Sequence, residues 1–80
     1  MTEANSSTVD RNSHIPTDEI TRDIAETERE IASMDRQETC LRTMGDKLSV
    51  YRADALRVRM EERQEFVYRL QQILAARGAL

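Results

Sequence analysis

Apolar residues recur at helical spacing between residues 18 and 44, on one narrow stripe of an otherwise charged segment. Steps of four and three residues alternate along this stripe, which is the spacing of a coiled-coil seam. Pro16 prevents a helix from extending backwards through it, and the Thr17 hydroxyl is suited to cap the first free amides. A helix over about 18–44, able to pack against one neighbour, is therefore predicted. Its seam consists of Ile20, Ile24, Thr27, Ile31, Met34, Glu38 and Leu41.

The pair Gly45-Asp46 interrupts the pattern. Glycine suits the left-handed position after a helix end, and aspartate suits the cap of a following helix. A single helix with a tolerated glycine is the alternative, but extending the first seam beyond Gly45 produces a stripe that is half charged. A shifted frame is far more apolar, so a turn at 45–46 is predicted. The shifted seam is Ala53, Leu56, Met60, Arg63, Val67, Leu70 and Leu74.

The second helix is predicted over about 47–77. Arg77 is expected in its last turn, where a cation is favoured, and Gly78 is expected to close the helix. Folding this helix back on the first one places Thr27 opposite Arg63, so that each helix contributes a polar residue to one layer. Two interpretations of Arg63 stay open: it sets the register from inside the seam, or it lies at the seam edge and reaches solvent.

These elements predict an all-α fold, an antiparallel two-helix hairpin of the coiled-coil type, with a flexible N-terminal tail over 1–16. The tail is rich in Ser, Thr and Asn, and its few large apolar residues cannot offset the entropy of ordering it. Within 80 residues, the single cysteine excludes an intrachain disulfide, and one cysteine with one histidine cannot form the usual closed zinc site. The thin core is therefore expected to be completed by dimerisation or by docking on a partner.

Charge divides along the chain. Acidic residues outnumber basic ones over 1–45 and the reverse holds over 46–80, so the two arms attract each other when laid side by side. The net charge of −3 argues against a chain that binds nucleic acid through overall positive charge. Neither a membrane-spanning apolar run nor an apolar secretory segment is present, so we expect a cytoplasmic location, in the cell's own or a host's cytoplasm.

The predicted second helix has more apolar surface than one neighbouring helix can cover. Residues beside its seam are expected to contact a second copy of the chain, forming a homodimeric four-helix bundle, or a different protein. The alternative is that these are ordinary scattered surface residues. The predicted partner interface consists of Tyr51, Ala55, Val58, Phe66 and Ile73.

Four arginines of the second helix indicate an alternative function, because they could contact phosphate in a nucleic-acid-binding helical bundle. Glu61, Glu62 and Glu65 interrupt these arginines and cancel much of their field, so a solvated face paired with the acidic arm is favoured. The arginines are Arg57, Arg59, Arg63 and Arg69.

No catalytic residue, cofactor site or metal site is predicted. Cys40 is expected opposite the first seam, without a histidine to activate it, and is interpreted as passive. The sequence contains no glycine-rich phosphate loop and no nucleophile elbow. We therefore expect a small non-enzymatic interaction module that acts through helix faces as an adaptor, an inhibitor or an assembly factor.

Overall fold

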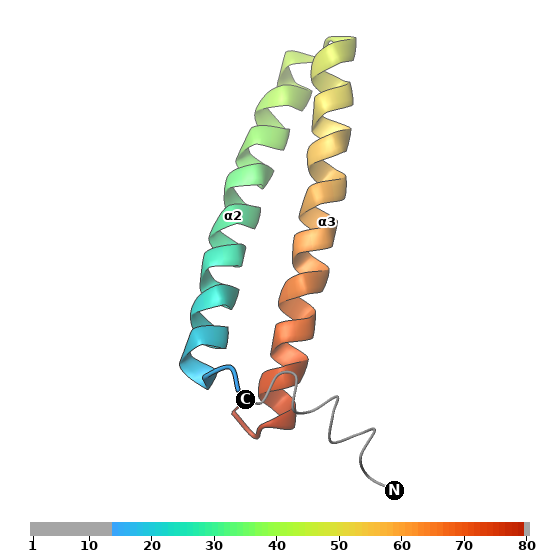
Figure 1. The fold of residues 1–80 in the computed structure, drawn as a ribbon. Coiled ribbons are helices and arrows are strands. Elements are labelled where there is room, and N and C mark those ends of the chain that lie inside the picture. Colours follow the sequence, from blue (N-terminus) through green and yellow to red (C-terminus); the bar gives the residue numbers. More distant parts are fainter. Residues whose placement is uncertain (1–13, 80) are drawn as a thin grey trace, which may run out of the picture.

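The computed structural model describes residues 14–79, which form two long helices, α2 (Thr17–Met44) and α3 (Lys47–Ala76). The helices lie side by side and run antiparallel, with the turn at one end of the hairpin and the start of α2 near the end of α3 at the other (Figure 1). The predicted fold class is confirmed: the chain is an all-α helical hairpin. The predicted flexible tail over 1–16 lies outside the described residues, except for 14–16.

The turn follows from the conformations that Gly45 and Asp46 favour. Gly45 has φ 77°, the left-handed conformation that L side chains rarely adopt. Asp46 then caps α3, because its carboxylate accepts hydrogen bonds from the Ser49 amide at 3.1 Å and the Ser49 hydroxyl at 2.6 Å. These two bonds, the hydroxyl first, lower the pKa of Asp46 below its ordinary value. The predicted break of the seam at Gly45 is confirmed.

The start of α2 differs in detail from the prediction. The N-cap residue is Pro16, which provides no side-chain cap; its carbonyl accepts hydrogen bonds from the amides of Glu19 and Ile20, and Asp18 Oδ1 also accepts from the Glu19 amide at 3.0 Å. Thr17 is already the first helical residue and its hydroxyl accepts a hydrogen bond from Arg77, so the predicted Thr17 cap is wrong. The acidic first turn of Asp18 and Glu19 is present as predicted.

The end of α3 closes in a left-handed turn at Gly78, with φ 74°. The Gly78 amide bonds to the Ala75 carbonyl at 3.0 Å and the Ala79 amide bonds to the Leu74 carbonyl at 2.8 Å, which is the Schellman pattern. Arg77 lies just beyond the helix rather than in its last turn. Its Nη1 donates to the Ile15 carbonyl at 2.6 Å and to the Thr17 hydroxyl at 3.2 Å, which joins the two ends of the hairpin.

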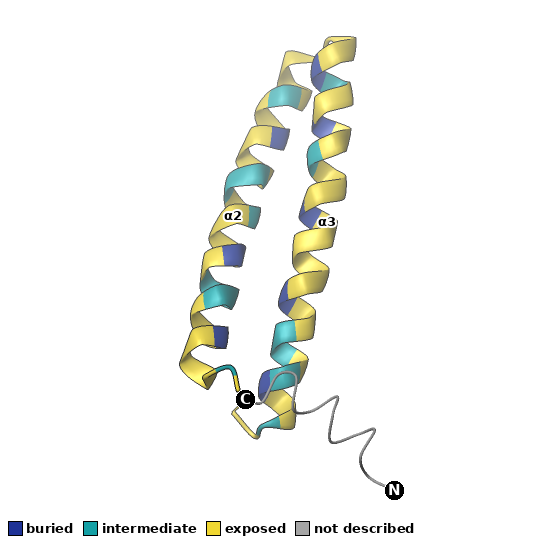
Figure 2. Cartoon of the chain, viewed as in Figure 1, coloured by how far each residue is buried: buried dark blue, intermediate teal, exposed yellow. Residues whose placement is uncertain are grey.

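The core is a single stripe between the helices. Buried residues face one another along the length of the hairpin while the outward faces are exposed (Figure 2). Each fully buried large apolar side chain stabilises the fold by roughly 1.5–3 kcal/mol relative to exposure. On α3, four residues of the shifted seam are buried, Leu56 and Leu70 are half-buried, and Arg63 is exposed. The buried residues are Ile20, Thr27, Glu38, Ser49, Ala53, Met60, Val67 and Leu74.

Arg63 lies at the seam edge. About half of its side chain is exposed, and its Nη1 is 3.6 Å from Glu30 Oε1 on α2. The structure therefore favours the edge position over a register-setting position inside the seam. Thr27 is buried whereas Arg63 is exposed, so the predicted layer with both residues inside the seam does not form.

The seam instead has its buried charge at Glu38, which is only 3% exposed. Arg42, one turn later on α2, places Nη2 2.8 Å from Glu38 Oε2. Arg57, from α3, places Nη2 3.0 Å from Glu38 Oε1. Arg42 also reaches Asp54 on α3 at 3.0 Å, and the bonds to Glu38 and then to Asp54 raise the pKa of Arg42 above its ordinary value. Two cations thus neutralise one buried carboxylate and link the helices near the turn.

Candidate functional site

Three residues of the predicted interface share the face of α3 that points away from α2. Tyr51 is 72% exposed, Val58 is 55% exposed, and Ala55 between them is also exposed. Leu48 extends the row by one turn and is 55% exposed. Steps of three, four and three residues keep all four on one side of a helix. We call this set, Leu48, Tyr51, Ala55 and Val58, the outer stripe.

Leu48 was not predicted as part of an interface, because the seam phase is ambiguous next to the turn. Either Leu48 or Ser49 could have faced the end of α2. The structure buries Ser49, at 5% exposure, through its bonds to Asp46. Leu48 is thereby turned outward, three residues before Tyr51.

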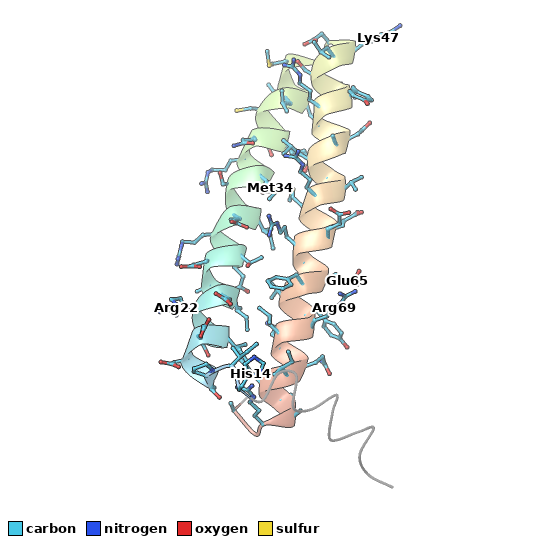
Figure 3. All side chains as sticks on the ribbon, in the orientation of Figure 1. His14, Arg22, Met34, Lys47, Glu65 and Arg69 are labelled. Carbon is cyan, nitrogen blue, oxygen red and sulfur yellow. The ribbon has the colours of Figure 1, made fainter. Side chains whose placement is uncertain are left out.

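The other two predicted interface residues do not lie on the outer stripe. Phe66 and Ile73 are two helical turns apart on the flank between the stripe and the seam; Phe66 is 42% exposed and Ile73 is half-buried. Charged residues occupy the continuation of the stripe towards the open end. Two of these, Glu65 and Arg69, are paired with each other and lie on the side of α3 away from α2 (Figure 3). The predicted interface is thus two separate surfaces.

Phe66 borders a shallow hollow of about 430 Å³ between the two helices. Met34 reaches into this region from α2, and its side chain points towards α3 (Figure 3). Arg59 and Arg63 supply two cationic side chains to the same hollow, with Glu62 beside them. The flank of α3 therefore combines apolar surface with positive charge.

The predicted phosphate-contacting arginines do not converge on one site. Arg57 is bonded to Glu38, Arg63 lies beside Glu30, and Arg69 is paired with Glu65. Arg57 and Arg59 are on opposite flanks of α3, because two residues along a helix correspond to about 200°. Within residues 14–79, Arg59 is the member of this set that forms no ion pair.

A cationic edge borders the outer stripe on the Phe66 side. It consists of Arg52 and Arg59, which are both exposed and seven residues apart. Arg52 contributes to the lowered pKa of Asp46 through its charge, after the hydrogen bonds from Ser49. The opposite edge is mixed in charge, with Lys47, Asp54 and Glu61 at the same seven-residue spacing. The stripe therefore has one positive edge and one edge without a dominant sign.

Cys40 is exposed on α2, beside a shallow hollow lined also by Arg36 and Leu41. Within the described part of the chain, no group of three or more His, Cys, Asp or Glu side chains is placed to hold a metal ion. Neither α2 nor α3 is long and apolar enough to cross a membrane. No protein-family model, curated protein or solved structure matches the chain. The functional interpretation therefore rests on the surface of the hairpin itself.

Proposed function

We propose that this chain is a non-enzymatic interaction module that binds a helix of another protein through the outer stripe of α3. The observation that carries this proposal is a continuous apolar row in which all three large side chains are more than half exposed. The row has the spacing with which one helix recognises another. Scattered surface residues have no such order.

The composition of the outer stripe suits helix docking. Ala55 sits between larger neighbours, which leaves a shallow place where a partner side chain can insert between Tyr51 and Val58. Each large side chain that is fully removed from water contributes roughly 1.5–3 kcal/mol, so three of them can offset much of the cost of association. The stripe spans about 15 Å along the axis, at about 1.5 Å per residue, and so matches two to three turns of a partner helix.

The position of the stripe fits an adaptor, an inhibitor or an assembly factor. It lies in the half of α3 next to the turn, at the far end of the hairpin from the junction between Ile15 and Arg77. A partner helix on this face would contact none of the buried seam residues. The module can therefore keep its own fold while it binds. The nucleic-acid alternative has less support, since three of its four arginines already have acidic neighbours.

A matched pair of tyrosine variants tests the proposal. The probe is a fluorescent amphipathic peptide of about 21 residues, three heptads with leucine at the core positions and glutamine at the edges. Binding to the full chain is measured by fluorescence anisotropy. Tyr51→Ser should weaken binding about tenfold or more, because Tyr51 is in the stripe. Tyr68→Ser is the control, since Tyr68 is 60% exposed but lies off the stripe.

The two variants separate specific docking from general stickiness. Equal affinity of both variants and the unchanged chain would contradict the proposal. Light scattering on the same samples then identifies whether a second copy of the chain can occupy the stripe. A dimer that dissociates in Tyr51→Ser but not in Tyr68→Ser would support helix docking with the chain itself as partner.

A further inference from the structure

The edges of the outer stripe differ in charge, and this difference bears on what the partner is. Arg52 and Arg59 lie about 10.5 Å apart along one edge, which is two helical turns. Arg59 forms no ion pair within residues 14–79. Arg63 lies one turn after Arg59, and its Nη1 is 3.6 Å from Glu30 Oε1. Beside the outer stripe this edge therefore carries positive charge at both Arg52 and Arg59, and Glu62 follows only further along, at the Phe66 hollow.

The opposite edge lacks this uniformity. Lys47 begins it, Asp54 follows and Glu61 ends it. Asp54 is occupied by Arg42, at 3.0 Å. A partner helix on the stripe would thus meet cationic side chains along one edge, and both acidic and basic side chains along the other. Charge at such edges sets partner choice and orientation more than total affinity.

A second copy of the chain is a poor occupant of this surface. Two stripes that pair antiparallel about a two-fold axis place the same edge of each copy together. Arg52 of one copy would then lie near Arg52 or Arg59 of the other, and like charges at facing edge positions are unfavourable. Self-association through this face would bring the exposed arginines of the two copies together.

From this asymmetry we infer that the partner is an amphipathic helix with acidic residues along one edge. This inference rests on the proposed function of the stripe. Its apolar residues cover the outer stripe. Acidic side chains seven residues apart face Arg52 and Arg59, because this spacing repeats along one edge of a packed helix. The orientation of the bound helix follows from the charge of its two edges.

Two peptides that differ only at their edges test this inference. Both have about 21 residues and the same leucine core; one has glutamate at the edges and the other has lysine. At low salt the acidic peptide should bind the full chain about tenfold more tightly, and the difference should shrink as salt is added. The double variant Arg52→Glu with Arg59→Glu should reverse the preference.

The control carries the same change of charge on the other helix. Arg22→Glu with Arg29→Glu alters two exposed residues of α2, and Arg22 points away from α3 (Figure 3). This control should keep the preference for the acidic peptide. If the Arg52 and Arg59 double variant melts earlier than the unchanged chain, Arg59→Gln replaces it and should lose about threefold in affinity for the acidic peptide.

The outcomes separate this inference from the proposed function. Equal binding of both peptides, still abolished by Tyr51→Ser, overturns the acidic partner and leaves helix docking in place. A dimer that needs Tyr51 assigns the stripe to a second copy and also overturns it. If the chain binds none of the three peptides, with glutamate, lysine or glutamine at the edges, both proposals are overturned.

Discussion

Helix α3 has two apolar stripes on opposite sides, and only one of them is covered. The seam stripe of Ala53, Met60, Val67 and Leu74 is buried against α2, whereas the outer stripe is open to solvent. Both repeat at the spacing of a packed helix, so the repeat alone does not reveal which one forms the core. The difference comes from α2, because its single narrow apolar stripe can cover only one face of α3. An apolar repeat therefore predicts a packing face, and the rest of the chain determines what occupies it.

The largest expected effect comes from placing the same charge on each stripe. Met60→Asp puts a carboxylate at a position that is 3% exposed, so the hairpin should lose its cooperative thermal transition. Val58→Asp places the same group on the outer stripe and should change the free energy of unfolding by about 0.5 kcal/mol or less. Circular dichroism melting of both variants measures the contrast. Similar melting of the two would show that the outer stripe is part of the core.

Glu38 tests whether the seam accepts a charge only because cations meet it. Glu38→Ala should lower the free energy of unfolding by about 2 kcal/mol, less than for a fully buried pair because water already screens Arg42 and Arg57. Urea unfolding measures this change. Glu38→Leu is the companion variant and should be neutral or slightly stabilising, since leucine restores packing without a charge. A larger loss for leucine than for alanine would contradict this account of the seam.

A smaller effect is expected from pH at the Asp46 cap. Because hydrogen bonds from Ser49 hold the folded-state pKa of Asp46 below its ordinary value, the charged cap stabilises the fold above about pH 3.9. This contribution is lost as the pH falls through the lowered pKa. Asp46→Asn keeps a capping side chain that does not titrate. The melting temperature of the unchanged chain should fall further than that of Asp46→Asn as the pH is lowered from 7 into the acidic range. Parallel losses would contradict a titrating cap.

The smallest expected effect is at the open end of the seam. Arg77→Gln removes a guanidinium that bonds to the Ile15 carbonyl and the Thr17 hydroxyl. The first turn of α2 should exchange its amide hydrogens faster, while amides near Gly45 keep their rates. Hydrogen exchange followed by nuclear magnetic resonance separates these regions. Equal acceleration at both ends would mean that Arg77 supports the whole hairpin.

Much of the fold could be predicted because it depends on local patterns. The step of four and three residues marks α2, and the change of frame at Gly45 marks the turn, where glycine and aspartate suit the required conformations. These signals are contained in short stretches of chain. Antiparallel packing then follows from a short connection between two long helices.

What could not be predicted depends on contacts between distant residues. Glu38 is a seam residue by spacing, but its burial depends on Arg57, 19 residues away, as well as on Arg42. Arg63 is a seam residue by the same spacing, yet its long side chain reaches the edge and Glu30. The sequence grouped Phe66 and Ile73 with Tyr51 because neighbouring helix faces are difficult to separate without knowing where α2 lies.

The bond between Arg77 and Ile15 joins residues 62 positions apart, almost the full span of the described chain. Contacts near Gly45 join residues that are close in sequence. The chain segments that these contacts close into loops are short, so the entropic cost of closing them is small. The hairpin is therefore expected to zip from the turn towards the open end. In that order the Arg77 bond forms last and breaks first. Its formation therefore reports that the open ends of the two helices have come together.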